Sequence, residues 1–180
     1  SRNYLNVDVL ESIANFIKRE FSKSSQRVVV QKFDADNRSY SNIIASFGPD
    51  DGERIIVGAH YDVCGDQDGA DDNASGVAGI LALAQLLKST DLKYRIDLVA
   101  YSLEEPPFFG TEQMGSYVHA KSLHDAKIRV KGMVCLEMIG YYSNQENSQK
   151  YPLGFLKWFY GNKSNYITIV QKSIEKKKKK

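Results

Sequence analysis

The stretch HYDVCGDQDGADDNASG, residues 60–76, decides how the rest of this chain is interpreted. It follows an apolar run at residues 54–59 and leads into a second apolar run at residues 77–87. A strand, an acid-rich loop and a helix in this order are typical of a site at the carboxyl end of a sheet strand. The stretch contains one histidine and five aspartates, and such crowded carboxylates repel one another unless a cation neutralises them. The sequence therefore predicts a cation site here.

The spacing within this loop suggests how a cation would be held. His60 and Asp62 stand two residues apart at the end of a predicted strand, so their side chains project to the same side. A metal-bound imidazole usually donates its other ring N–H to a carboxylate, and Asp62 is placed for that contact. Asp72 precedes the predicted helix, where the helix dipole favours a negative charge. The alternative is a solvated acidic turn in which Asn73 or Ser75 caps the helix, and the loop alone does not separate the two interpretations.

Length and composition indicate an ordinary globular domain. The chain has 180 residues, of which 42% are hydrophobic and 26% charged, so we expect one domain that covers residues 1–180. No apolar run approaches the ~20 residues that span a bilayer, and we expect no membrane span. The first eight residues do not have the form of a signal peptide, although a leader removed earlier would leave no trace here.

The net charge of +2 is a property of the end of the chain. Residues 176–180 are five lysines, and subtracting them from the total leaves −3 for the body. A basic tail can bind nucleic acid or anionic lipid. No basic or aromatic groove signal accompanies this one, so we expect no nucleic-acid partner and interpret the tail as a disordered or appended end.

The two cysteines, Cys64 and Cys135, do not form a disulfide framework. Neither belongs to a CxxC motif, and both lie near the carboxyl ends of predicted strands. One disulfide and two free thiols both remain open interpretations, because nothing else in the sequence indicates the redox compartment.

Apolar periodicity predicts an α/β fold. Residues 7–21 have the helical period, and residues 28–33 and 41–47 are β-branched runs around a polar turn, which predicts a hairpin. Further strands are expected at 54–59, 94–101, 128–136 and 166–170, and helices at 74–88, 111–122 and, as a start or a frayed end, 171–180. Alternating strands and helices imply right-handed crossovers and parallel pairing. We therefore expect a three-layer α/β/α domain with a mixed, mostly parallel central sheet.

Acidic residues follow three of the predicted strands. They are His60 with Asp62, the pair Glu104 and Glu105, and Glu137. The carboxyl ends of parallel strands meet at one edge of a sheet, and one imidazole with several carboxylates suits zinc or a similar divalent ion. One glutamate of the pair can bind the metal while its neighbour takes a proton from water whose pKa the metal lowers toward ~7. A Glu-Glu pair before two prolines would alone indicate exposed surface, but its coincidence with two other acidic strand ends favours a site.

Four motifs resemble those of the M28-type zinc-dependent exopeptidases, which include bacterial aminopeptidases. They are HYD at 60–62, GADDNASG at 69–76, the EE pair within SLEEPPFFGTEQMGS at 102–116, and LEMIGYY at 136–142. The motifs occur in the order of the family, and the resemblance runs from about residue 40 to residue 142. It implies a zinc-exopeptidase-like fold, one or two Zn²⁺ ions, a peptide substrate, and a secreted or periplasmic location. Glutaminyl cyclases share this fold.

The resemblance also implies a role for each acidic residue. His60 would bind one zinc with Asp62 as its partner, and Glu104 would be the general base. Asp72 would bridge two zincs, with an unusual cis peptide after it, and Glu105 would bind the second zinc. Glu137 stands where the family has its next acidic ligand, often an aspartate.

One departure from the family concerns its last metal ligand. The family takes this histidine from a loop well after the position of Glu137, and this chain has no histidine there. His119 and His124 lie earlier, and we expect surface or helix-end roles for both. We therefore interpret the chain as a C-terminally shortened member with a complete first metal site and a partial second one. Three functions remain open: hydrolysis of N-terminal residues from peptides, metal binding with recognition of a peptide or partner but little or no catalysis, and glutaminyl-cyclase-like chemistry.

Overall fold

The computed structural model describes residues 1–151 and 153–171. The chain divides into two compact units, Ser1–Gly140 and Tyr141–Lys180. The first unit contains the sheet and all the residues predicted to form the site. The predicted helix start after residue 171 and the lysine run lie outside the described residues. Among the residues that are described, no helix is long and apolar enough to cross a membrane.

The N-terminal helix and the hairpin form as the sequence predicts. Helix α1 (Val7–Ser22) buries one face with a spacing of three or four residues: Leu10, Ala14, Ile17 and Phe21. Strands β1 (Val28–Ala35) and β2 (Arg38–Phe47) pair antiparallel. Asp36 and Asn37 connect them with φ angles of 47° and 57°. Positive φ at both central residues is what a tight two-residue hairpin turn requires, and Asp and Asn tolerate it better than most residues.

The central sheet is mixed and has the strand order β1-β2-β4-β3-β5. Strand β3 (Arg54–His60) runs parallel to both β4 (Arg95–Tyr101) and β5 (Val130–Cys135), which gives the expected parallel core. The hairpin joins this core through β2, which is antiparallel to β4 as well as to β1. Parallel and antiparallel pairings are therefore equal in number in this sheet, whereas we expected a mostly parallel one.

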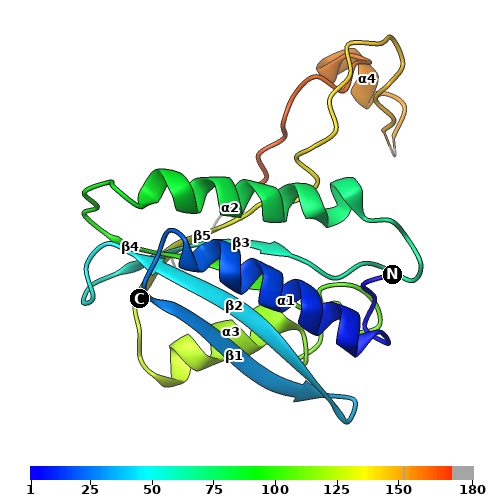
Figure 1. Cartoon of the computed structure of the whole chain (residues 1–180). Helices are drawn as coiled ribbons and strands as arrows, with labels where there is room; N and C mark the ends of the chain where they lie inside the picture. Colours follow the sequence, from blue (N-terminus) through cyan, green and yellow to red (C-terminus); the bar gives the residue numbers. More distant parts are fainter. Residues whose placement is uncertain (152, 172–180) are drawn as a thin grey trace, which may run out of the picture. The chain divides into compact units, whose positions relative to one another are not determined.

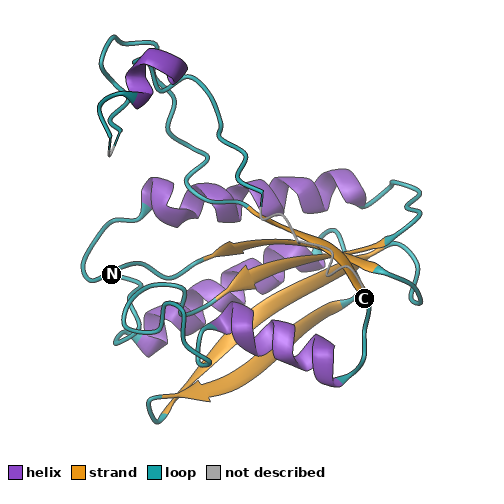
Figure 2. Ribbon diagram, turned by 180° about the vertical axis from the view of Figure 1, so that it is seen from behind, coloured by secondary structure: helices purple, strands orange, loops and turns teal. Residues whose placement is uncertain are grey.

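Helices cover both faces of the sheet, which makes the three-layer α/β/α architecture (Figures 1 and 2). Helices α1 and α2 (Gly76–Leu87) pack on one face, and α3 (Gly115–Asp125) packs on the other. Successive side chains of β4 point to opposite faces of the sheet and pack in two different hydrophobic clusters. Leu98 and Ala100 belong to the core under α1 and α2, whereas Val99 and Tyr101 belong to the core under α3.

Two helices begin later than the sequence predicts. A wide turn, Ala70–Ser75, comes before α2, where we expected a helix from residue 74. Helix α3 begins at Gly115 and not at residue 111, because hydrogen-bonded turns at Thr111 and Met114 come first. Both irregular stretches lie at the carboxyl end of the parallel strands, next to the predicted site.

The second unit, described by itself, contains little regular structure. Its helix α4 (Leu156–Tyr160) lies between two irregular segments. The amide of Ser143 donates to Ser164 O at 2.8 Å and that of Gln149 to Asn162 O at 3.1 Å, which holds these segments together. The strand predicted at 166–170 is wrong. Its β-branched run has no strand partner among the described residues, and Ile169 is 91% exposed.

Candidate metal centre

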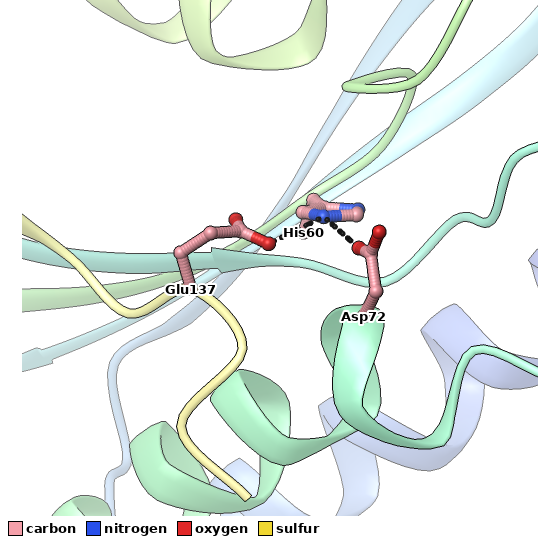
Figure 3. Close-up of side chains that lie close together, drawn as sticks. All are labelled: His60, Asp72 and Glu137. Carbon is pink, nitrogen blue, oxygen red and sulfur yellow. Dashed lines mark ion pairs between the residues drawn. The ribbon is translucent and has the colours of Figure 1, made fainter. Parts of the chain in front are cut away.

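Three loops bring acidic side chains to His60, the last residue of β3. His60 is 2% exposed, and its Nε2 lies 3.2 Å from Asp72 Oδ1 and 3.5 Å from Glu137 Oε1. Figure 3 shows the two carboxylates approaching the imidazole from different sides. Glu104 Oε2 lies 3.8 Å from the same nitrogen. The acids of three strand ends therefore meet at one edge of the sheet, as the sequence predicts, and the peptide between Asp72 and Asn73 is cis, as the resemblance implies.

Asp62 lies on the other side of the imidazole. It is 1% exposed, and its Oδ1 is 3.4 Å from Nδ1 of His60. The sequence predicts this contact. It does not predict that the same carboxylate accepts hydrogen bonds from the amides of Glu104 and Glu105, each at 3.1 Å. Asp62 thus fixes the turn that carries the Glu-Glu pair relative to the histidine.

The donor set fits a zinc-like dication. Within the part of the chain that the structure describes, neither ring nitrogen of His60 makes a hydrogen bond, although both are buried, and orphaned buried polar atoms are rare. Tetrahedral zinc with bonds of roughly 2.0–2.2 Å would place neighbouring ligand atoms about 3.4 Å apart. The two short separations around Nε2, 3.2 and 3.5 Å, bracket that spacing.

Two groups of side chains have ligand atoms close enough to share an ion. One is His60, Asp72 and Glu137, and the other is His60, Glu104 and Glu105. Within each group the ligand atoms lie within 4.8 Å of one another. Both groups contain His60, so they are two halves of one centre.

The acids of this centre repel one another in the absence of a cation. Burial alone would lower the pKa of His60, but the carboxylate of Asp62 and the charges of Glu104 and Glu137 raise it to about 9. Burial raises the pKa of Glu104 to about 7, against the opposing charge of His60 and with help from Glu105. Burial and the charge of Asp72 likewise raise the pKa values of Glu105 and Glu137. A dication would relieve this repulsion.

Asn73 is a residue of the centre that the sequence indicates only as a helix cap. Its side chain is fully buried. Its Oδ1 accepts from the amides of Gly76 at 3.1 Å and Met138 at 3.3 Å, so it does cap α2. Its Nδ2 donates to Leu136 O at 2.8 Å and to Glu137 Oε2 at 3.1 Å. The one feature of the sequence that could have indicated this role in the centre is the place of Asn73 directly after the acidic residues of the loop.

The other histidines and the cysteines lie outside the groups that could hold a metal, as far as the structure describes the chain. His124 is exposed in the last turn of α3, as expected. The same expectation is wrong for His119, which is 3% exposed because α3 turns it toward the sheet, where its Nδ1 lies 3.0 Å from the hydroxyl of Tyr101. Cys64 and Cys135 are free thiols.

Comparison with known proteins agrees with the motifs. The model of Peptidase family M28 matches residues 42–176. The chain belongs to peptidase family M28. Its residues in the family motifs are those that meet around His60, which links the family pattern to the geometry of the centre.

Relatives within and near this family are similar over different lengths. The Uncharacterized protein YfbL of Escherichia coli (strain K12) is 46% identical over 173 residues, which are 92% of this chain and 53% of that protein. Leucine aminopeptidase 2 of Trichophyton rubrum is 34% identical over 107 residues, which are 58% of this chain and 21% of that protein. The chain therefore spans about half of the length of YfbL, and less of the aminopeptidase.

A solved structure shares the fold. Glutaminyl cyclase of Porphyromonas gingivalis superposes with a TM-score of 0.64 and 25% identity. The match covers 76% of this chain and 52% of the cyclase. The α/β/α arrangement is thus common to this M28 member and to a cyclase.

Proposed function

We propose that this chain forms the metal-binding part of a zinc-dependent exopeptidase that removes N-terminal residues from peptides. The observation that carries the proposal is the buried imidazole of His60, which makes no hydrogen bond to any described residue and faces Asp72 and Glu137 at the spacing of zinc ligands. Membership of family M28 and the likeness to an aminopeptidase support the reaction class. When bound, zinc supplies Lewis acidity and makes water a nucleophile at neutral pH.

The residues of the chain divide the remaining work between them. Glu104 takes the proton of the attacking water as general base, and its Oε2 lies 3.8 Å from His60 Nε2, beside the place where the ion would be held. Its side chain is 30% exposed, so water reaches it. Asp62 holds the amide of Glu104 in place and orients His60. Glu105 would be a further ligand, because it belongs with His60 and Glu104 to the second group that could hold an ion.

The test is a comparison of Glu104→Gln with the unchanged chain. The amide keeps the size of the side chain but accepts no proton, so we expect hydrolysis of aminoacyl p-nitroanilides to fall by about 10²–10⁴-fold. Zinc content by elemental analysis should be retained. Glu112→Gln is the matched control, because Glu112 is an exposed glutamate that accepts a hydrogen bond from Tyr117 and belongs to neither group of possible metal ligands among the described residues. Equal rates for Glu104→Gln and the unchanged chain would remove Glu104 from the mechanism.

A second candidate function is metal binding with recognition of a peptide but without turnover. It is favoured by the two groups of possible ligands among the described residues, which have one imidazole between them, that of His60. The likeness to a glutaminyl cyclase adds a further substrate to test, a peptide with N-terminal glutamine. Zinc bound without turnover of either kind of peptide would favour this second function, whereas two zinc ions per chain with hydrolysis would eliminate it.

A further inference from the structure

The first residues of the chain lie along residues 61–69, which we call the metal loop because His60 and Asp72 flank it. Figure 1 shows the N-terminus beside this loop, which leads into the turn before α2. Ser1 Oγ donates to Gly65 O at 2.7 Å, and Asn3 Nδ2 donates to the same oxygen at 2.9 Å. The amide of Val63 donates in return to Arg2 O at 3.3 Å. Each of the two segments, the N-terminal one and the metal loop, thus donates hydrogen bonds to the other.

The guanidinium of Arg2 connects the two ends of the metal loop. Its Nε donates to Tyr61 O at 2.8 Å, at the start of the loop. Its Nη1 donates to Asp68 O at 2.9 Å and its Nη2 to Gly69 O, both at the end of the loop. One planar group therefore satisfies backbone carbonyls from both sides, which the fixed fork of arginine allows and a lysine ammonium does not.

The end of the loop leaves no room for a side chain at Gly69. A Cβ there would clash with Val63 Cγ1, and it would stand 2.5 Å from Arg2 Nη2 and 2.6 Å from Asp72 O. Gly69 also has a φ of 65°, which glycine adopts without strain. Glycine at this position lets the guanidinium approach the backbone directly before the turn that carries Asp72.

The charge of Arg2 lies within the field of the metal centre. Burial lowers the pKa of its guanidinium, while the carboxylates of Asp62 and Asp72 act in the opposite direction. A positive charge near the centre would by itself oppose cation binding, so a favourable effect of Arg2 on zinc must come through geometry.

We propose that Arg2 is a positioning residue of the metal centre, which holds the two ends of the metal loop together and so fixes His60 and Asp62 relative to Asp72. The zinc part of this inference rests on the proposed function. Ligands must be held within about 0.5 Å of their working positions, and a loop whose ends separate does not meet that requirement. Arg2 acts through the loop backbone and contacts no reacting atom.

The test compares Arg2→Ala and Arg2→Lys with Arg38→Ala, in the full chain. Arg38 is the matched control, because its side-chain hydrogen bond and ion pair among the described residues are made to Asp36 in the hairpin turn, outside the metal loop. Zinc affinity is measured by competition with a chelator, and amide hydrogen exchange of residues 61–69 by mass spectrometry. Both Arg2 variants should weaken zinc binding by about 10- to 100-fold and speed exchange in the metal loop. Arg38→Ala should stay within about twofold of the unchanged chain.

The lysine variant separates geometry from charge. If charge alone mattered, Arg2→Lys would behave like the unchanged chain and Arg2→Ala would bind zinc more tightly, and either result would overturn the proposal. Circular dichroism reports whether each variant is folded, and Arg2→Lys decides the matter if Arg2→Ala does not fold. Zinc binding without peptide hydrolysis by the unchanged chain would refute the proposed reaction while leaving Arg2 as a positioning residue. No zinc binding by the unchanged chain would refute both.

Discussion

Asn73 Nδ2 donates a hydrogen bond to Glu137 Oε2 at 3.1 Å, across the junction between α2 and the end of β5. Asn73 directly follows Asp72, so one buried side chain connects the segments of two candidate metal ligands. The same nitrogen also holds Leu136 O, so the backbone before Glu137 is fixed together with its side chain. Asn73 therefore sets the separation of Asp72 and Glu137 without facing the ion itself.

Replacing Asn73 by alanine should weaken both stability and metal binding. The change leaves Leu136 O and the amides of Gly76 and Met138 without their partner, and the buried Gly76 amide alone costs about 1–3 kcal/mol of the free energy of unfolding when it is unsatisfied. Zinc affinity should fall by about 10- to 100-fold, because Glu137 loses its support. Urea denaturation of the metal-free chain and a zinc titration check the two effects. Asn144→Ala, at an exposed position, is the control and should change neither.

Asn73→Asp sharpens this prediction. An aspartate still accepts from Gly76 and Met138, but its carboxylate has no proton to donate and stands against Glu137. The variant should therefore be more destabilised at pH 8 than at pH 5, where the added acid is more easily protonated. Stability and zinc affinity that match the unchanged chain in both variants would show that Asn73 only fills space.

The metal-free chain should lose stability as the pH rises. The folded-state pKa of His60 is about 9 against an ordinary value of 6.5, so the folded chain holds an extra proton between these values and loses that stabilisation as the proton dissociates. The pKa of Glu104, about 7 against 4.5, acts in the same direction over the lower range. Urea denaturation at pH 5, 7 and 9 should show the free energy of unfolding falling by an amount on the order of 2 kcal/mol, after allowance for solvent screening.

Zinc should reverse this trend. His60 would have to lose its proton to hold the ion, so the apparent zinc affinity should rise with pH until the pKa of His60 is passed near 9. His60→Gln should abolish the part of the change in the free energy of unfolding that occurs between pH 6.5 and 9. The same variant should lose most of the zinc binding. A metal-free chain that becomes more stable from pH 6.5 to 9 would contradict the charge arrangement around His60.

The sequence predicts the centre because its main parts follow from strand order. Apolar runs place His60, Glu104 and Glu137 after strands, and parallel strands end at a common edge. The sequence does not predict the residues that support the centre. Arg2 reaches carbonyls about sixty positions away along the chain, and those contacts depend on the path of an irregular loop that periodicity does not describe.

The expectations that failed share a physical cause. The run at 166–170 has strand propensity, but a strand forms only where a neighbour supplies hydrogen bonds, and the described residues supply none. The position of His119 near a helix end predicts a surface or helix-end role, yet His119 is buried because α3 turns that face toward the sheet. The neighbour of a strand and the buried face of a helix both depend on the tertiary structure, so the local sequence pattern does not determine them.

Strand β5 is an exposed edge of the sheet, and it should make the chain associate with itself. Among the described strands it pairs only with β3, and all six of its residues are exposed. Val130, Met133 and Val134 are 43%, 50% and 51% exposed. An unpaired strand with apolar side chains is a template for pairing with another chain. Light scattering during size-exclusion chromatography should therefore give an average mass that rises with protein concentration.

Val134→Lys should reduce this association, because a charged side chain on an edge strand disfavours pairing with a second copy. The matched change Val29→Lys places the same charge on β1, the other edge, where Lys32 and Asp34 already stand, and should leave association unchanged. Both measurements need a reductant, since Cys135 on β5 is an exposed free thiol that could link two chains covalently. A mass equal to one chain at every concentration would contradict the prediction. Equal association of both variants would place the contact elsewhere, because only Val134→Lys alters β5.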